Sequence, residues 1–595
     1  MKPKVIWSLL SVLIAATFLI SSCSSGTTSK TTTVITGVIN TPTTAATTPK
    51  TTPTTTAAST TTVPTTTASN EPVYGGSMSI VVSQTGGFDP AKSINFFPTW
   101  CLIYDALVTE DWSKGPSGTG EIPLASNYTP QRYFVGALAE SWEIVDPLNI
   151  IYHIRKDVHF WAESMVQGRE LTADDIVFNF NRAVASPNST MYNVKVTIKK
   201  IDKYTVQFTH VDAVLEIIKD GWNNLVIGAP EVAQKYGDMS DWKTVAGTGP
   251  YRVTDVVSDS SVTLTKNTNY FMFDPLHPAN RLPYIDNIRM LVIVDPATQD
   301  AAIRTGKIAT LGVPTDRGKS ILKTNPELKS RRLFGSNSYV LCLRTDIAGT
   351  PLANVKVRQA LSMAIDRNAI INGLYGGDAT IMQWPYQPSA GAAFTPVDQL
   401  PADLKKLFEY HPQDAKALIA EAGYPTGFDL TIELLQGTYA GGTDLYSVVK
   451  SNWDSIGIKT TLLVDDATAF WSRLVGRTYK DTSPCAWGNS SPQGALAAHL
   501  STYLYNYSKV NDPKIDKAYY DAAAEINDAK RDVIYKDIGQ YIIGQQFYIN
   551  LPTPYSYAFW QPWLKGYNGE VAWGTVNGWY GMYRFSWIDQ SLKNK

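Results

Sequence analysis

The 595-residue chain is predicted to fold as an α/β protein behind an unfolded N-terminal segment. Strand-like and helix-like patterns alternate from residue 71 onward, which predicts mixed secondary structure. Hydrophobic residues make up 44% of the chain, and 16 tryptophans and 32 tyrosines supply the apolar surface for large cores. No repeat with a period of about 20–50 residues is present, so a solenoid is not expected. The length favours several domains, or one fold with large subdomains.

The N-terminal residues 1–22 are typical of a secretory signal. Lys2 and Lys4 precede an apolar run over residues 5–20, which is short for a membrane-spanning helix of about 20 residues. The run ends in Ile20-Ser21-Ser22-Cys23, which resembles a bacterial lipobox, where the cysteine that follows the cleavage point receives diacylglycerol. We therefore expect lipidation of Cys23 and a membrane anchor; the alternative is an ordinary signal peptide with an incidental cysteine.

Residues 23–70 are predicted to be a disordered stalk. Within residues 27–70, 22 of the 44 residues are threonine, and there is neither an aromatic residue nor an acid. Such a segment cannot form a core, so nothing offsets the entropy lost on ordering it. Extended at about 3.1 Å per residue, it would reach up to roughly 130 Å. The function we favour is a spacer that lifts a domain off a membrane, and the alternative is a tolerated low-complexity insert.

Local patterns place several elements in the remaining chain. A helix is expected over Ala173–Ala185, with Thr172 as its N-cap and Asp175 completing a capping box. A second helix begins at Asn354, because apolar residues recur on one face after it. Strands are expected at Ser77–Val82, Tyr251–Val257 and Ser261–Lys266, the last two forming a hairpin.

Composition and motifs exclude several kinds of chemistry. Lys and Arg total 52 against 53 Asp and Glu, a net charge of −1, so nothing favours binding of nucleic acid. The six histidines are scattered and no Cys-x-x-Cys is present, so no zinc site is indicated. No Gly-x-Ser-x-Gly is present for a hydrolase nucleophile. The segment from Gly312 to Ser320 has five residues between its glycines, where a phosphate-binding loop has four. We therefore expect a protein that is not an enzyme and uses no cofactor or metal.

Three cysteines remain after lipidation: Cys101, Cys342 and Cys485. One disulfide is possible in an exported protein, and it would leave one free thiol. The sequence does not select the pair, and all three thiols being buried and reduced is an equal alternative.

Short motifs follow one another in a fixed order through residues 73–570. They are Gly87-Phe88-Asp89-Pro90, Leu138-Ala139-Glu140-Ser141-Trp142-Glu143, Leu171-Thr172-Ala173-Asp174-Asp175, Gly247-Thr248-Gly249-Pro250-Tyr251, Leu282-Pro283-Tyr284-Ile285-Asp286, and a run from Val357 to Arg367. Each motif is weak alone, but the shared order over some 500 residues is specific. In these motifs the chain resembles the extracellular solute-binding proteins of family 5, the peptide/nickel type, which are receptors of ABC importers.

The resemblance implies a two-lobed periplasmic-binding-protein-like fold with an extra inserted small domain, closing on a ligand in the cleft between the lobes. We expect lobe I to comprise residues 71–108, 225–300 and 546–595, the inserted domain residues 109–224, and lobe II residues 301–545. Trp142 is expected in a core, and Asp366 and Arg367 at a helix end. The implied protein is a monomeric receptor on the outer face of the bacterial cytoplasmic membrane that passes its solute to an ABC permease. The alternative is a surface-anchored hydrolase of glycans or peptides.

The loop at residues 485–492 bears on which class of solute the protein binds. Peptide receptors of the family often carry Trp-x-Ala/Gly-Asp-x-x-Asp-Pro, whose first acid holds the peptide's α-ammonium. The matching residues 485–492 contain no acid; the nearest are Asp481 and Asp512. A buried ammonium would lack its charge partner, so an oligosaccharide or other neutral solute is favoured over the peptide implied by the family. Nickel and haem gain no support from the histidines.

Candidate ligand contacts are aromatic and uncharged polar side chains, because sugars present apolar faces and hydroxyl edges. They are Gln84, Phe96, Phe97, Trp100, Gln383, Trp384, Trp471, Trp487, Asn489 and Ser490.

Overall fold

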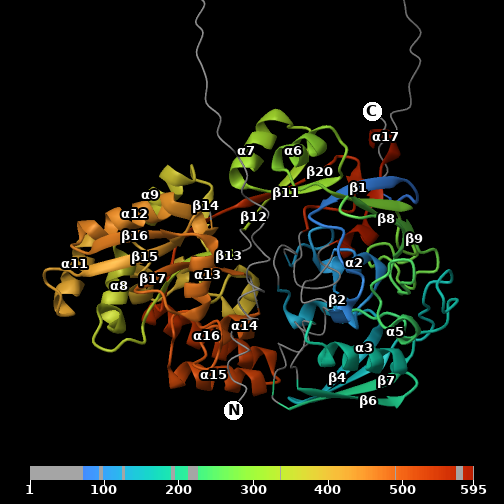
Figure 1. The fold of residues 1–595 in the computed structure, drawn as a ribbon, viewed down its shortest axis with the longest axis horizontal. Helices are drawn as coiled ribbons and strands as arrows, with labels where there is room; N and C mark the ends of the chain where they lie inside the picture. The colour runs from blue at the N-terminus through green and yellow to red at the C-terminus, as the bar shows by residue number, and fades with distance from the viewer. Residues whose placement is uncertain are drawn as a thin grey trace, which may run out of the picture.

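The computed structural model describes residues 71–92, 98–122, 128–188, 195–211, 213, 225–334, 337–437, 439–488, 491–570 and 580–593. The expectations for the signal, Cys23 and the stalk lie outside these residues. The described chain forms two bodies with a smaller layer of helices and strands above their junction (Figure 1). The mixed α/β class is confirmed.

Lobe I is built on a four-stranded sheet in the order β1-β10-β9-β8. β1 runs parallel to β10, and the other pairs are antiparallel. Both the predicted first strand and the predicted hairpin are confirmed. The strands are β1 (Ser77–Val82), β8 (Tyr251–Val257), β9 (Ser261–Lys266) and β10 (Asn287–Val292), with α2 (Trp100–Ile103) beside them and β21 (Leu564–Lys565), β22 (Trp587–Ile588) and α17 (Gln590–Lys593) from the end of the chain.

A buried ion pair ties the end of the chain into this lobe. Arg584 Nη1 lies 3.1 Å from Asp105 Oδ1, and both side chains are almost fully buried. Tyr270 Oη donates to the same carboxylate at 2.9 Å, and Arg584 Nη2 donates to the carbonyl of Cys101 at 2.9 Å. Segments far apart in the sequence therefore share one hydrogen-bonded charge cluster in the core of lobe I.

The glycines of the predicted Gly247-Thr248-Gly249 turn are explained by close packing of backbone. A Cβ on Gly247 would lie 2.0 Å from the carbonyl oxygen of Ile103, well inside van der Waals contact. The motif is therefore a turn that enters β8, as the sequence predicts, and it serves the fold.

The inserted domain is an antiparallel sheet in the order β4-β5-β7-β6, covered by α3. The predicted capping box of Thr172 and Asp175 is present at the start of α3, and Trp142 packs partly buried against this core. Arg182 on α3 donates two hydrogen bonds to Asp89 of the opening turn, which ties the domain to lobe I. The elements are β2 (Val108–Glu110), β3 (Phe134–Gly136), β4 (Ala139–Asp146), β5 (Asn149–Ile154), α3 (Ala173–Ala185), β6 (Val196–Asp202), β7 (Thr205–His210) and α5 (Pro230–Tyr236).

A three-stranded antiparallel sheet, β11-β20-β12, lies above the junction of the bodies (Figure 1). Its core packs against Val81, Leu291 and Ile293 of lobe I. The stretch from Gly312 to Ser320 is the end of a strand and the start of a helix, as expected for an ordinary segment. The elements are α6 (Pro296–Arg304), β11 (Thr310–Pro314), α7 (Thr315–Thr324), β12 (Lys329–Leu333) and β20 (Ser556–Trp560).

Lobe II is a five-stranded sheet in the order β16-β15-β17-β13-β18, with a helical layer on each face. One layer comprises α8 (Val355–Met363), α11 (Pro412–Glu421) and α12 (Gly442–Ser455). The other comprises α13 (Ala467–Gly476), α14 (Pro492–Ala497), α15 (Pro513–Ala524) and α16 (Asp528–Gln545). The strands are β13 (Asn337–Leu343), β15 (Asp429–Leu435), β16 (Lys459–Asp465), β17 (Thr482–Gly488) and β18 (Tyr548–Asn550), and the short helices α9 (Arg367–Ala369) and α10 (Ala402–Lys406) complete the lobe.

Two details of lobe II bear on the sequence predictions. Cys342 on β13 and Cys485 on β17 form a disulfide, which leaves Cys101 buried and free. Asp366 caps the start of α9, while the buried Arg367 donates to the carbonyl of Ser362 near the end of α8. Both residues therefore lie at helix ends, as expected.

The chain crosses between the bodies twice, after β12 and before β20. β18 completes the lobe II sheet, and β19 (Pro552–Pro554) pairs with β14 (Ala379–Ile381) just before the return crossing. One crossing therefore lies between β12 and β13, and the other between β19 and β20. Asp378 is buried beside them, accepting from Tyr557 Oη at 2.7 Å and from Arg332 Nη1 at 3.3 Å.

In the part of the chain that the structure describes, no helix is long and apolar enough to cross a membrane.

Candidate ligand site between the lobes

The predicted anchor Trp487 lies at the end of lobe II that adjoins the crossing segments. Gly488, the last residue of β17, pairs with Asn337, the first residue of β13 after the crossing. Trp487 pairs with the next residue, Ser338. The register of two neighbouring strands thus brings Trp487 and Gly488, the described start of the loop predicted to contact ligand, to the junction of the lobes.

Trp487 belongs to a group of packed aromatic rings. Its indole stacks on that of Trp384, with ring centroids 5.0 Å apart and planes at 10°. Trp384 is 3% exposed and also stacks on His499, at 5.9 Å. Tyr507 lies tilted at 5.3 Å from Trp487, whose side chain is half-buried. The ring therefore contributes to the packing of lobe II, in addition to any contact it makes with ligand.

Hydrogen bonds hold residues 383–387 against the same end of the lobe II sheet. The backbone N–H of Trp384 donates to Asn550 Oδ1 at 2.6 Å. Gln387 Nε2 donates to Ser338 Oγ, and more weakly to the carbonyl of Trp487 at 3.5 Å. These bonds hold Gln383 and Trp384 beside Trp487, so three of the sequence candidates come together.

Five buried polar atoms of this group have no hydrogen-bond partner among the described residues: Gln383 Nε2, Trp384 Nε1, Gln387 Oε1, Trp487 Nε1 and His499 Nε2. Burial lowers the pKa of His499 to about 4, so its imidazole is neutral at pH 7. His499 Nδ1 faces the carbonyl of Ala495 at 3.1 Å and must carry the proton, which makes Nε2 an acceptor. The group therefore offers three donors and two acceptors, a mixture that hydroxyl groups satisfy in both directions.

The acids that flank β17 are already engaged. Glu433 and Asp465 both lie within ion-pair distance of Arg473, at 3.1 and 2.8 Å. Asp481 Oδ2 accepts the backbone N–H of Thr431 at 2.9 Å. Asp512 accepts from Tyr541 Oη at 2.7 Å and from the N–H of Lys514. Asp481 lies at the opposite end of β17 from Trp487, and none of these four carboxylates belongs to residues 485–492.

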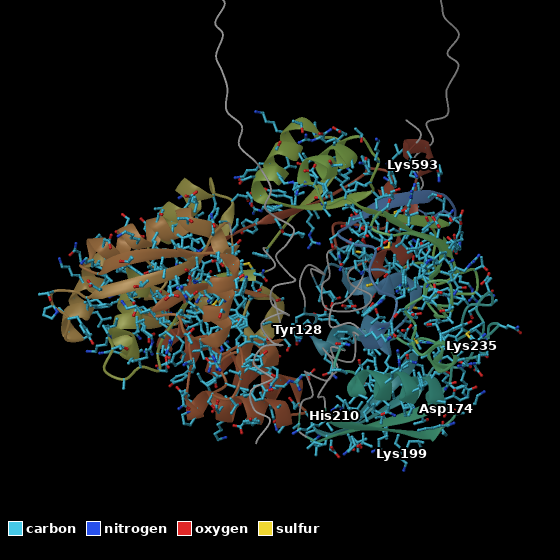
Figure 2. The ribbon with its side chains drawn as sticks, viewed as in Figure 1. Tyr128, Asp174, Lys199, His210, Lys235 and Lys593 are labelled. Carbon is cyan, nitrogen blue, oxygen red and sulfur yellow. A yellow bond between two sulfur atoms is a disulfide. The ribbon has the colours of Figure 1, made fainter. Side chains whose placement is uncertain are left out.

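The segment that follows Gln387 faces the inserted domain. A cavity of about 90 Å³ is lined on one side by Pro388, Ser389 and Gly391 of lobe II, and on the other by seven residues: Glu121, Ile122, Tyr128, Thr129, Pro130, Arg132 and Tyr133. Tyr128 lies on the side of its domain that faces lobe II (Figure 2). A Cβ on Gly391 would come within 3.4 Å of Arg132 Nη2, so the two bodies approach closely here. Residues 388–391 therefore form part of the boundary between lobe II and the inserted domain.

The other predicted candidates are placed elsewhere or are not described. Trp100 is 2% exposed in the core of lobe I, and its Nε1 donates to the carbonyl of Gly87 at 2.8 Å. Gln84 is exposed just after β1. Trp471 packs on Tyr439 at 5.1 Å, at the margin of the lobe II core. Phe96, Phe97, Asn489 and Ser490 lie outside the described residues.

Sequence reasoning missed Ser338, Gln387, His499 and Tyr507. No local motif marks them, because they join the group only through the register of β13 with β17 and through helix packing. No cluster of three or more His, Cys, Asp or Glu side chains arranged to hold a metal occurs among the described residues.

Comparison with known proteins identifies the family. The family model for bacterial extracellular solute-binding proteins, family 5 (middle region), matches residues 134–508, more than half of the chain. The chain belongs to this family. Heme-binding protein A of Haemophilus influenzae is 26% identical over 462 residues, covering 72% of this chain and 81% of the relative. The dipeptide-binding protein of Pseudomonas aeruginosa is 25% identical over 540 residues, covering 83% of this chain and 92% of the relative.

The fold agrees with the family. HbpA2 of Haemophilus parasuis superimposes with a TM-score of 0.70 at 21% identity, over 86% of this chain and all of that one. The two-lobed binding-protein fold inferred from the sequence is therefore confirmed. The matched relatives are binding proteins by name, so this family 5 protein is a solute receptor of the ABC importer type, and the alternative of a surface hydrolase gains no support.

Proposed function

We propose that this family 5 protein is a lipid-anchored extracytoplasmic receptor that captures a neutral, hydroxyl-rich solute between its lobes and delivers it to an ABC permease. An oligosaccharide is the class of solute that we favour. One observation carries the choice: a group of aromatic rings with unfilled donors and acceptors lies beside a specificity loop without an acid.

Charge is the argument against a free peptide. A peptide amino terminus is an ammonium, and burying it without a carboxylate costs several kcal/mol. The loop at Trp487 supplies no acid, and the nearby Glu433 and Asp465 are already paired with Arg473. A sugar needs no counter-charge, and its hydroxyls match both kinds of unfilled atom around Trp384 and Trp487.

The names of the relatives suggest a peptide as the competing class of ligand. One is named as a dipeptide-binding protein and another as a heme-binding protein. A peptide ligand for this chain would require an acid elsewhere in the cleft to hold the ammonium.

Calorimetric titration of the purified mature protein separates the two classes. The panel contains free-amine di- to tetrapeptides, the same peptides with acetylated amino termini, and neutral oligosaccharides of two to six units. We expect saturable binding of an oligosaccharide without turnover. Micromolar binding of free-amine peptides that is lost on acetylation would refute the neutral-solute proposal, because it would show recognition of an ammonium.

Anchoring is supported by sequence alone. Ile20-Ser21-Ser22-Cys23 supplies the expected lipidation site, and residues 23–70 supply the spacer. Stable attachment requires more than one acyl chain, which a diacylglyceryl cysteine provides.

A further inference from the structure

A row of aromatic rings extends from the candidate site to the surface of lobe II. Successive ring centroids lie 5.0 Å apart from Trp384 to Trp487, 5.3 Å from Trp487 to Tyr507, 6.1 Å from Tyr507 to Tyr505, and 5.8 Å from Tyr505 to Tyr503. The buried tryptophans and the tyrosines of the loop after α14 thus form one continuous series.

Burial decreases along this row. Trp384 is 3% exposed, whereas Tyr505 is 41% and Tyr503 is 36% exposed. Leu504 between these tyrosines is also exposed. Large apolar side chains that gather at a surface often mark an interaction site, whereas single ones do not.

Hydrogen bonds of the buried Asn506 side chain hold the loop that carries the tyrosines in place. Asn506 is buried, and its Nδ2 donates to the carbonyls of Leu500 and Val510 at 2.9 and 2.7 Å. Its Oδ1 accepts the N–H of Val510 at 2.9 Å. The rings are therefore pre-organised, which reduces the entropy lost when a ligand binds to them.

The part of the loop that holds the tyrosines has no charged side chain. Residues 499–508 read His-Leu-Ser-Thr-Tyr-Leu-Tyr-Asn-Tyr-Ser, and burial keeps His499 neutral at pH 7. The charged residues of the same loop are already engaged, Lys509 with Asp346 and Asp512 with Tyr541 and the N–H of Lys514. Tyrosines that combine an aromatic face with a hydroxyl suit the apolar faces and hydroxyl edges of sugar rings.

We propose that Tyr503, Tyr505 and Tyr507 form an outer subsite on which successive rings of an oligosaccharide stack, continuing the site at Trp487. This inference rests on the proposed function, because it assumes that the site takes a neutral saccharide. It adds that the ligand is a chain longer than a disaccharide, part of which lies on the surface of lobe II.

The test measures how affinity depends on ligand length. Cello-, manno- and malto-oligosaccharides of two to six units are titrated into the wild-type protein, Tyr505→Ala, Tyr505→Phe and the control Tyr410→Ala. Tyr410 is an equally exposed tyrosine of the same lobe, outside the row. In the wild type we expect affinity for one series to rise about tenfold from two to six units.

Tyr505→Ala should remove most of that rise while changing affinity for the disaccharide less than twofold. Tyr505→Phe keeps the ring and should retain the rise, and Tyr410→Ala should behave as wild type. Thermal melting of each variant verifies that the fold is retained.

The outcomes that overturn the inference are distinct. If a disaccharide binds but longer chains bind no tighter, or if Tyr505→Ala keeps the length dependence, the outer subsite is refuted and the proposed function stands. If only peptides bind, the neutral-solute proposal fails, and the subsite fails with it. If no saccharide of the panel binds, the oligosaccharide assignment of the row is refuted.

Discussion

Replacement of Trp487 by alanine should weaken both folding and ligand binding, and the structure sets the size of each loss. A tryptophan buries about 150–250 Å² when fully enclosed. Trp487 is half-buried, so at about 25 cal/mol per Å² its burial contributes about 2–3 kcal/mol. The stack on Trp384 adds about 1 kcal/mol. We expect the free energy of unfolding to fall by about 3–4 kcal/mol.

The loss in binding follows from the role of an aromatic anchor. Such a residue commonly contributes about 1.4–2 kcal/mol to binding, so affinity should fall by roughly ten- to thirty-fold. Trp487→Phe should recover much of the stacking in both measurements, but it lacks the indole Nε1 donor.

Urea unfolding and calorimetric titration of the same preparations measure the two losses. Trp587→Ala is the matched control, because Trp587 is a partly buried tryptophan of lobe I that packs on Tyr284 at 5.9 Å, at the end of the chain. It should cost similar stability and leave affinity unchanged. Normal ligand affinity in Trp487→Ala would refute its role as an anchor, and unchanged stability would refute the packing argument.

Four further predictions follow from other parts of the chain. Cys23→Ser should move the protein from the detergent-extracted membrane fraction to the soluble fraction; continued membrane retention would contradict lipidation. Deletion of residues 27–70 should leave the melting midpoint unchanged, and a decrease of several degrees would show that this segment is part of the fold. Asn489→Asp should lower affinity for a neutral sugar and, if it changes peptide affinity, raise it; calorimetry with both ligand sets decides. Arg584→Met should destabilise the protein by about 3–5 kcal/mol in urea unfolding, because it leaves Asp105 buried without its cation; a loss below 1 kcal/mol would contradict that account.

The local elements were predictable because their signals are local. The capping box before α3 and the alternating residues of the β8–β9 hairpin each act within a few residues. The crossings between the bodies carry no such local signal. β12 and β20 resemble any other strands in sequence, and only their pairing places them above the junction with lobe I.

The candidate site was predictable in part for the same reason. Trp487 could be found because it matches the tryptophan of a family motif. Gln383 and Trp384 could be found because they are an amide and an aromatic residue, the residue types expected to contact a sugar. His499 and Tyr507 reach Trp384 and Trp487 only through tertiary packing. The choice of Cys342 and Cys485 for the disulfide likewise depends on the register of β13 with β17. In that register Cys485 pairs with Val340, so Cys342, two residues further along β13, lies diagonally across from it.

The positions of the chain ends have a mechanical consequence. β1, the first strand, and α17, the last helix, both lie in lobe I, where Lys593 Nζ donates to the carbonyl of Ser77; Figure 1 shows the two elements together. Among the described residues, lobe II contains neither the first nor the last element, and the two crossings are its covalent links to the rest. Rotation about those crossings, the hinge type of domain closure, would move lobe II relative to β1 without moving β1 within lobe I. Closing of the lobes would therefore not stretch a tether joined ahead of β1, and the work of closure would not depend on the length of that tether.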